Sequence, residues 1–300
     1  MVESGRARFT TLPRLLDLAA EFPELAPLAR PAVRLHPYPG EPTPQHSSIG
    51  GPMLWPIDET WPLCPDCIDL VSSLEGTGPE DLVLPMVPLL QIFARDVPQL
   101  PFPTGYDLFQ LLWCPAELHG QTELTRLALW RDSTKVSAVL SPTPEVDGSI
   151  VTIDDYSIPA PCALHPEAII DFPSGWELDA QLRGRINEQV EVFHASYDRD
   201  LGAAPGAKVG GWPEWFREPA YPRCALGHPM LHLVSLTSGE ATGPAASWSA
   251  VREAVPEPAR WGHADPSNPT GLIIQSYGNL SVFCCAVCPD RPTSVLEHCG

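Results

Sequence analysis

Apolar residues along this chain of 300 residues occur mostly in short runs that end at proline, glycine or aspartate. Four such runs, residues 87–93, 107–113, 127–130 and 271–283, are predicted to be strands. Proline lacks the backbone N–H that central strands and helix interiors need, so 37 prolines predict many turns and few long helices. The pattern therefore predicts a predominantly β fold.

Two segments place apolar residues at helix-like intervals. Residues 12–25 do so between two prolines, which predicts one short amphipathic N-terminal helix. Residues 176–193 are the second candidate helix. Helices are thus expected to be a minor part of the fold.

An internal repeat relates two distant segments. Ser-Ile-Gly-Gly-Pro-Met-Leu-Trp-Pro, starting at Ser48, aligns with Lys-Val-Gly-Gly-Trp-Pro-Glu-Trp-Phe, starting at Lys208. Each segment continues through a Pro-Met pair into an apolar run and then into a strand-like run that delivers cysteine. Five residues recur 160 positions later without a gap: Gly50, Gly51, Trp55, Pro62 and Cys64 become Gly210, Gly211, Trp215, Pro222 and Cys224.

Two copies of one supersecondary unit can pack as a pseudo-symmetric pair and share a core. We therefore expect an α+β, predominantly β fold built from two such copies. Residues 1–160 should hold the N-terminal helix and the first copy, and residues 161–300 the second. Residues 141–161, rich in Pro, Ser and Asp, are the predicted passage between the copies.

Charge limits the partners that the chain can bind. The formal net charge is −19, and only Lys135 and Lys208 are lysines among 18 basic residues. No basic strip is available to neutralise phosphates, which argues against nucleic-acid binding, including binding through zinc-ribbon-like turns. An acidic surface favours basic partners, although general solvation of a lysine-poor protein is the better explanation of this charge.

No apolar stretch approaches the ~20 residues of a transmembrane helix. The first residues lead to no hydrophobic segment of a signal peptide, so we expect a cytoplasmic protein without membrane contact. Nine cysteines then need an explanation, because cytosolic reductants keep thiols from forming structural disulfides. Metal ligation is the first alternative to consider.

The cysteines gather in short-spaced pairs or beside histidine, as in structural zinc sites, and each copy offers one set of four ligands. The first set is Cys64, Cys67, Cys114 and His119, and the second is Cys224, His228, Cys285 and Cys288. Zinc is therefore the predicted cofactor. The competing explanation is that these cysteines are small buried hydrophobes.

Other cysteines and histidines fit this scheme less well. Cys284 is expected to pack inward, and His298 and Cys299 are spare ligands near the C-terminus. Cys162 and His165 have ligand spacing but no counterpart in the other copy.

Four protein ligands leave no position for an activated water, so the metal is expected to hold loops together. The two Gly-Gly pairs are too short for a phosphate loop, and neither is followed by Lys-Ser/Thr. No G-x-S-x-G or H-E-x-x-H motif occurs. The sequence thus predicts no catalytic and no nucleotide-binding residue.

The order of these motifs resembles two families. Ser-Ile-Gly-Gly-Pro-x-x-Trp-Pro, followed by Trp-Pro-x-Cys-x-x-Cys and Pro-Leu-Leu-Gln-Ile, is similar to the bacterial YwqG-like family. The second copy, which ends in Phe-x-Cys-x-x-Cys, is similar to the eukaryotic programmed cell death protein 2 family and its yeast ribosome-assembly relatives. The resemblance covers about residues 32–130 and 207–299.

The resemblance implies a duplicated β-rich α+β fold, no established enzymatic activity and a protein-binding role. Eukaryotic relatives are chaperones of a small-subunit ribosomal protein, and some bacterial members lie in toxin and immunity neighbourhoods. This chain departs from the eukaryotic Cys-x-x-Cys pattern at Cys224-Ala-Leu-Gly-His228, where His228 must replace the second cysteine. It also inserts residues 68–84 in the first copy.

We therefore expect a non-catalytic zinc-binding module that holds a protein partner, either chaperone-like or as an immunity protein bound to a toxin. The partner should have a basic face. Trp212 and Trp215 are candidate contacts, although core packing explains them better. The alternative is a zinc-dependent hydrolytic enzyme, in which the first set holds water in place of a fourth ligand and Glu117 acts as the base.

Overall fold

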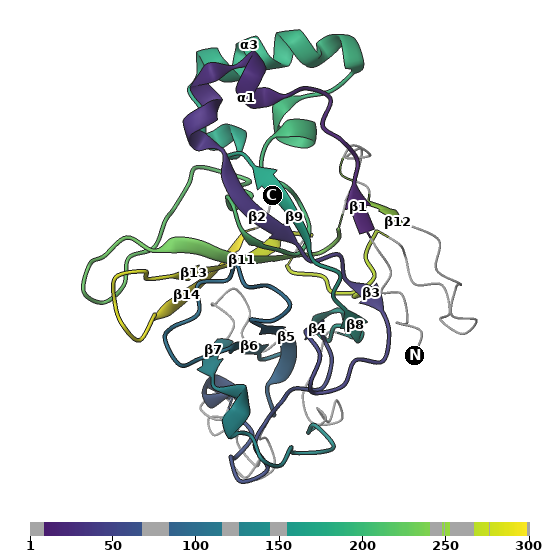
Figure 1. Cartoon of the computed structure of the whole chain (residues 1–300), viewed down its shortest axis with the longest axis vertical. Helices are drawn as coiled ribbons and strands as arrows, with labels where there is room; N and C mark the ends of the chain where they lie inside the picture. Colours follow the sequence, from purple (N-terminus) through teal and green to yellow (C-terminus); the bar gives the residue numbers. More distant parts are fainter. Residues whose placement is uncertain are drawn as a thin grey trace, which may run out of the picture. The chain divides into compact units, whose positions relative to one another are not determined.

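The computed structural model describes residues 9–67, 84–115, 126–144, 155–240, 248, 250–252, 267–275 and 277–298. In this part of the chain the fold is mostly β, with fourteen strands in three sheets and few helices (Figure 1). The predicted predominance of strands is therefore confirmed. Within the described residues, no helix is both long enough and apolar enough to cross a membrane.

The chain divides into two compact units. We call the first the terminal unit, because it contains both ends of the chain: Met1–His36, His165–Pro269 and Ile273–Gly300. We call the second the inserted unit: Pro37–Leu164 and Thr270–Leu272. The expected boundary at residue 160 lies close to Leu164, the end of the first segment of the inserted unit, and Met1–His36 falls in the same unit as His165–Pro269.

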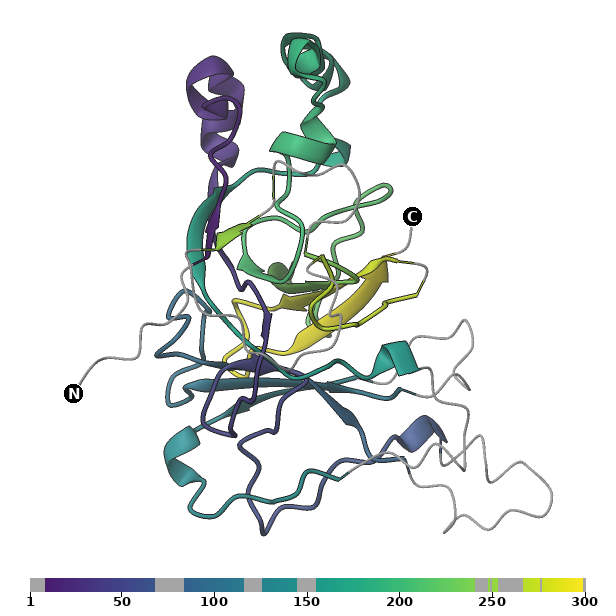
Figure 2. The ribbon, with the colours of Figure 1, turned by 90° about the vertical axis from the view of Figure 1, so that its right-hand side faces the viewer.

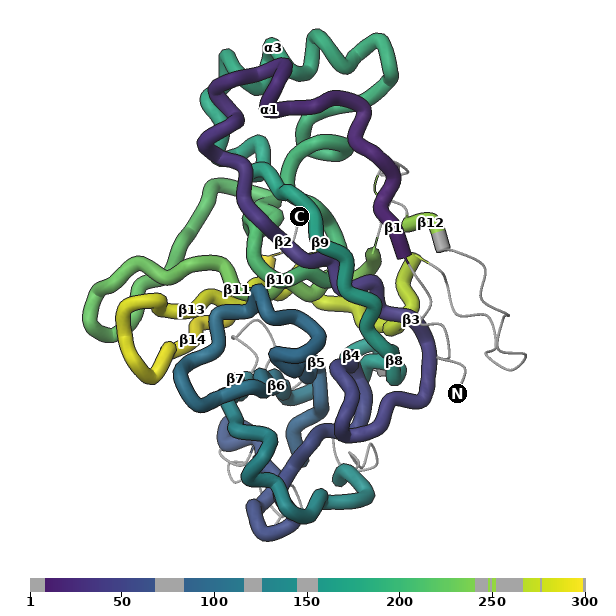
Figure 3. Tube along the Cα trace, in the orientation of Figure 1, coloured from purple at the N-terminus to yellow at the C-terminus, as the bar shows by residue number. Residues whose placement is uncertain are grey.

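The sheet of the terminal unit explains this placement. Its strand order is β14-β13-β11-β10-β2-β9, and each pair of neighbours is antiparallel. Strand β2 lies between β10 and β9, so both of its edges are paired inside this unit. Figure 3 shows β11, β13 and β14 running next to one another. The six strands are β2 (Arg30–Arg34), β9 (Glu167–Asp171), β10 (Lys208–Gly210), β11 (Leu231–Thr237), β13 (Asn279–Cys284) and β14 (Thr293–His298).

The inserted unit contains a second six-stranded sheet, with the order β3-β8-β4-β5-β6-β7. Three of the four predicted strands fall here and are confirmed. Its strands are β3 (Tyr38–Pro39), β4 (Ser48–Ile49), β5 (Val87–Phe93), β6 (Leu108–Trp113), β7 (Arg126–Arg131) and β8 (Cys162–Ala163). A separate two-stranded sheet in the terminal unit pairs β1 (Phe9–Thr11) with β12 (Ala250–Arg252).

The fourth predicted strand, residues 271–283, is only partly a strand. Pairing begins at Asn279, where β13 starts. Gln275 and Tyr277 have φ angles of 47° and 62°, a left-handed conformation that does not continue an extended strand. The backbone therefore turns before it enters the sheet.

The two six-stranded sheets correspond in strand order. β4-β5-β6-β7 in the inserted unit matches β10-β11-β13-β14 in the terminal unit. The second strand of each series has a register shift near its start, between Pro88 and Leu90 in β5 and between His232 and Val234 in β11. The segments aligned by the sequence repeat thus lie at matching positions in the strand order.

Helical segments occur at the two predicted places in the terminal unit. The first is α1 (Leu18–Glu21), capped by Asp17, and then the 3₁₀ helix η1 (Pro23–Leu28). A single helix over residues 12–25 is thus not formed, because Pro23 has no N–H to continue α1. The second is α3 (Ala180–Val190), which has a 3₁₀ turn on either side. Figure 2 shows the two segments side by side.

These helical segments share an apolar core, which explains why they lie together. Leu18, Phe22 and Leu25 from the first segment pack in one cluster with Leu182 and Ile186 from α3. All five side chains are buried. The helices therefore cover their own apolar faces with one another.

Candidate metal centres

Among the described residues, two groups of cysteine and histidine side chains can hold a metal ion. In each group the ligand atoms all lie within 4.8 Å of one another. We call them the four-ligand cluster, Cys224, His228, Cys285 and Cys288, and the three-cysteine cluster, Cys64, Cys67 and Cys114. The eighth predicted ligand, His119, lies outside the described residues.

The geometry of the four-ligand cluster fits one tetrahedral ion. The Nδ1 atom of His228 lies 3.5 Å from Sγ of Cys224, 3.5 Å from Sγ of Cys288 and 3.8 Å from Sγ of Cys285. The Sγ atoms of Cys224 and Cys288 are 3.9 Å apart. Zinc bonds of about 2.3 Å to sulfur and about 2.0 Å to nitrogen place tetrahedral neighbours roughly 3.5 to 3.8 Å apart. The observed separations agree with these edges.

A tight turn presents the first two ligands. The N–H of Cys224 donates to the carbonyl of His228 at 3.0 Å, and the N–H of Gly227 donates to the carbonyl of Cys224 at 2.8 Å. Gly227 has a φ of 79°, which favours glycine because other side chains are strained there. The Gly in Cys-Ala-Leu-Gly-His therefore permits the turn that brings thiolate and imidazole together.

The other two ligands lie in the connection between β13 and β14. The N–H of Cys285 donates to the carbonyl of Pro292 at 3.0 Å, which closes the hairpin. The N–H of Cys288 points back to Sγ of Cys285 at 3.4 Å, and this bond lowers the pKa of Cys285 to about 6. Burial and the neighbouring thiols raise the pKa of Cys288 to about 12. The negative charges of Cys224 and Cys285 contribute to the raised pKa of Cys288, and a divalent cation bound among these thiolates would offset that repulsion.

The three-cysteine cluster is wholly buried, since each of its side chains has an exposed fraction of 0%. Cys114 directly follows β6, and its Sγ lies 3.4 Å from Sγ of Cys67. The Cys114 contact lowers the pKa of Cys67, but contact with Cys64, burial and the charges of Cys64 and Asp66 raise it to about 12. Three soft donors thus converge in an apolar environment, which suits a thiophilic ion.

The remaining cysteines and histidines lie outside both clusters. Cys284 points away from Cys285, with its Sγ 3.7 Å from the carbonyl oxygens of Cys285 and Arg291, as the alternation of side chains along β13 requires. Cys162 is buried in β8. The rings of His165 and His298 pack against Phe9 and Trp215, at centroid distances of 4.8 and 4.7 Å. Cys299 lies outside the described residues.

The two candidate contact tryptophans are core residues. Trp215 has an exposed fraction of 4% and packs with Cys224, Cys285 and Phe283. Trp212 has an exposed fraction of 8%, and its Nε1 donates to the carbonyl of Leu28 at 2.9 Å. Core packing therefore describes both, and neither is available as a large exposed contact.

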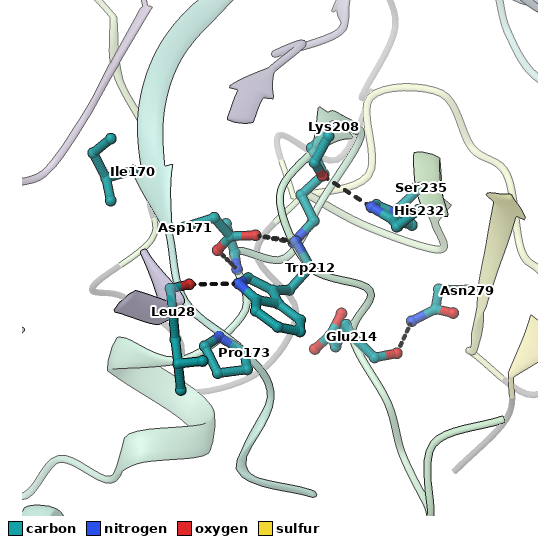
Figure 4. Close-up of polar contacts among 12 residues, drawn as sticks. Leu28, Ile170, Asp171, Pro173, Lys208, Trp212, Glu214, His232, Ser235 and Asn279 are labelled. Carbon is teal, nitrogen blue, oxygen red and sulfur yellow. Dashed lines mark hydrogen bonds and ion pairs between the residues drawn. The ribbon is translucent and has the colours of Figure 1, made fainter. Parts of the chain in front are cut away.

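Sequence reasoning missed a buried ion pair next to the second Gly-Gly motif. Nζ of Lys208 lies 2.8 Å from Oδ2 of Asp171, and both side chains have exposed fractions of 0% (Figure 4). Asp171 also accepts the N–H groups of Trp212 at 2.9 Å and Ala204 at 2.8 Å. A Cβ atom on Gly211 would lie 2.4 Å from Oδ2 of Asp171. The glycine thus makes room for the carboxylate.

The arrangement as a whole can bind soft divalent cations at two places. The four-ligand cluster supplies a complete protein ligand set, whereas the three-cysteine cluster supplies three of four corners from described residues. No protein-family model matches the chain, and a search of the curated proteins found no match.

Proposed function

We propose that this chain is a non-catalytic zinc-binding protein that holds a protein partner. The four-ligand cluster carries the proposal, because three thiolates and one imidazole are a common structural zinc set and together leave no position for a reactive water. We place the protein in the cytoplasm, where its buried free cysteines would stay reduced.

Metal analysis tests the zinc part of the proposal. Full-length protein purified without chelator should contain at least one zinc ion per chain, and two if the three-cysteine cluster gains a fourth ligand. Cys285→Ser should remove one equivalent. The matched control is Cys284→Ser, which changes the neighbouring thiol outside the cluster. Folded wild-type protein without zinc would contradict the proposal.

The likeness of the two sheets supports a proposal about their origin. We infer that they descend from one duplicated module of the YwqG-like type. Beyond strand order, the N–H of Met86 donates to the carbonyl of Pro62 at 3.0 Å, and the N–H of Met230 donates to that of Pro222 at 3.1 Å. The first glycine of each Gly-Gly pair also agrees, because Gly50 and Gly210 have left-handed φ angles of 64° and 69°.

The proposed partner is a protein with a basic face, which the module would hold as a chaperone or as a toxin-binding immunity protein. The net charge of −19 supports a basic partner through electrostatic complementarity. Among the described strands, β9 and β14 stand at the ends of their sheet with a partner strand on one side only, and a segment of the bound protein could pair on the other. Binding should then slow as salt rises, because screening weakens the attraction.

Affinity capture from the native host, followed by mass spectrometry, tests the partner. At low salt we expect a basic protein that is retained by the wild-type chain and lost with zinc-depleted Cys285→Ser. A chain that captures no protein would overturn this part of the proposal without affecting the zinc result.

A second candidate function rests on the three-cysteine cluster. With only three described ligands, it could keep one position for water and act as a hydrolytic zinc site. The proposed base, Glu117, lies outside the described residues. Turnover of a small-molecule ester or amide that disappears in both Cys64→Ser and Glu117→Gln would favour this enzyme over the binding module.

A further inference from the structure

A cavity of about 320 Å³ opens in the terminal unit, and none of its lining residues is a ligand of either cluster. Three aromatic side chains line it: Trp176, Trp215 and Phe216. Trp176 is half exposed, with an exposed fraction of 50%, whereas Trp215 is buried. The cavity is therefore lined by one buried aromatic ring, that of Trp215, and by one that solvent can reach, that of Trp176.

The two arginines of the cavity are already paired with acids. Arg183 contacts Oδ2 of Asp198 through Nε at 2.9 Å and Nη2 at 2.5 Å. Arg199 donates through Nε to Oδ2 of Asp200 at 2.9 Å. Neither guanidinium is thus left to bind an anionic ligand without first giving up a carboxylate.

Glu214 is the lining acid that makes no ion pair with any described residue. The nearby cation, Lys208, is paired with Asp171 at 2.8 Å, and Figure 4 shows no dashed line between Glu214 and that pair. Burial raises the pKa of Glu214, an effect that the charge of Lys208 and a hydrogen bond with the Asn279 side chain only partly offset. A positively charged ligand would supply the missing counter-charge.

The size and lining of the cavity narrow the class of ligand. A volume of about 320 Å³ is at the low end of the range of ligand pockets, about 300 to 1,000 Å³, and so suits one small group and not a nucleotide. Aromatic faces attract ammonium and guanidinium groups, and rings around such a group form the usual cage for alkylated ammonium. A neutral apolar ligand would bring no positive charge to Glu214.

We propose that this cavity binds one organic cation, an alkylammonium or guanidinium group, with Glu214 as its counter-ion and Trp176 and Trp215 as its aromatic walls. Such a group can belong to a free amine or to a basic side chain of another protein. The proposal does not rest on the proposed function, because no lining residue is a ligand of either cluster and the cavity requires no macromolecular partner.

The test is a titration of the full-length, metal-loaded protein at constant ionic strength, followed by tryptophan fluorescence and NMR chemical shifts. The probes are tetramethylammonium, N-acetylargininamide and neutral N-acetylglutaminamide. We expect saturable binding of at least one cation and none of the neutral probe. Tighter binding of tetramethylammonium would indicate a free amine or methylated side chain, and tighter binding of the arginine derivative would indicate a protein side chain.

Three variants make the result specific. Glu214→Gln should weaken cation binding by about 10-fold or more, and Trp176→Leu by about 3- to 10-fold, because each removes one part of the recognition. Glu188→Gln, an acid of α3 outside the cavity lining, should leave the affinity unchanged. Equal affinity in wild type and folded Glu214→Gln, or equal binding of the neutral probe, would overturn the proposal. If Glu214→Gln fails to fold, Trp176→Leu decides instead, because its half-exposed position should tolerate the change and an unchanged affinity would overturn the proposal.

Discussion

The four-ligand cluster and the three-cysteine cluster start from matching backbone but differ in the loop after the first cysteine. In the terminal unit, the N–H of Cys224 donates to the carbonyl of His228 at 3.0 Å. In the inserted unit, the N–H of Cys64 donates to the carbonyl of Leu84 at 2.9 Å. Leu84, which has an exposed fraction of 2%, therefore stands where the other cluster has its imidazole.

This difference teaches how a site can keep its place while its ligands change. Residues 65–83 separate Cys64 from Leu84, and the second ligand near Cys64 is Cys67, three residues after it. Cys114 and Cys285 occupy matching places, since each directly follows the strand paired with β5 or β11. The two clusters thus share two ligand positions and differ in the others.

The largest effect should come from removing a ligand of the complete set. Cys285→Ser should lower the melting temperature by roughly 10 °C or more, because metal binding and folding are coupled. Cys114→Ser should have a smaller effect, since fewer described ligands hold the other ion. Calorimetry with zinc analysis of both variants checks this order. A larger loss in Cys114→Ser would show that we ranked the clusters wrongly.

The buried ion pair of the terminal unit should give the next largest effect. Lys208→Met removes the closer of the two cations at the buried Asp171 carboxylate and leaves only Arg14, whose Nη2 atom lies 4.0 Å from Oδ1, so it should cost about 3 kcal/mol of unfolding free energy. Denaturant titration measures the loss. The matched control is the other lysine, Lys135, whose side chain is 80% exposed and whose change to Met should cost less than about 0.5 kcal/mol.

The two Gly-Gly motifs allow a direct comparison between units. Gly211 has a φ of +65° and would place a Cβ atom 2.4 Å from Asp171, so Gly211→Ala should cost about 2 to 4 kcal/mol. A Cβ atom on Gly51 would meet side-chain atoms of Pro42 and Ser48 at 2.7 Å, a longer approach than at Gly211, and Gly51 has no positive φ. Gly51→Ala should therefore be milder. Equal losses in urea titrations would contradict the assignment of strain to Gly211.

Acid should weaken the terminal unit through its buried histidines. Burial lowers the pKa of His36 to about 4 and that of His232 to about 3. Their folded pKa values lie below the unfolded value of about 6.5, so the unfolded state binds more protons and stability falls as pH drops from about 6.5 to 4. Glu240 opposes this trend, since burial raises its pKa to about 7.

For His36 alone, the loss at pH 5 should be about 2 kcal/mol. Urea midpoints at pH 7 and pH 5 measure it, with His36→Asn as the variant that lacks this titration. If the two proteins lose the same stability between these pH values, His36 is not a source of the acid sensitivity.

Local patterns in the sequence were sufficient for three strands of the inserted unit and for the seven predicted ligands that the two clusters bring together. Alternation and short apolar runs identified β5, β6 and β7, because each strand is bounded by its own turn residues. The pairs Cys64 and Cys67, and Cys285 and Cys288, were recognisable because a tight turn brings residues three apart to one ion.

Features that depend on distant pairing were not predictable in the same way. Nothing local in β2 shows that it pairs with β10 and β9 instead of joining the sheet that follows it in sequence. The Lys208–Asp171 pair likewise joins two strands far apart in the chain, and the only signal was a lysine next to Gly-Gly in a lysine-poor protein. That His119 is the fourth ligand of the three-cysteine cluster remains a prediction.

The pairing of β2 also has a consequence for synthesis on the ribosome. Residues 30–34 leave the exit tunnel before residues 37–164, the main stretch of the inserted unit, yet their partners β9 and β10 are translated only after that stretch. The inserted unit begins and ends in adjacent strands, with Tyr38 opposite Ala163 and Pro39 opposite Cys162. Residues 37–164 can therefore fold as soon as β8 emerges, whereas β2 stays without its partner strands until β9 and β10 have been translated.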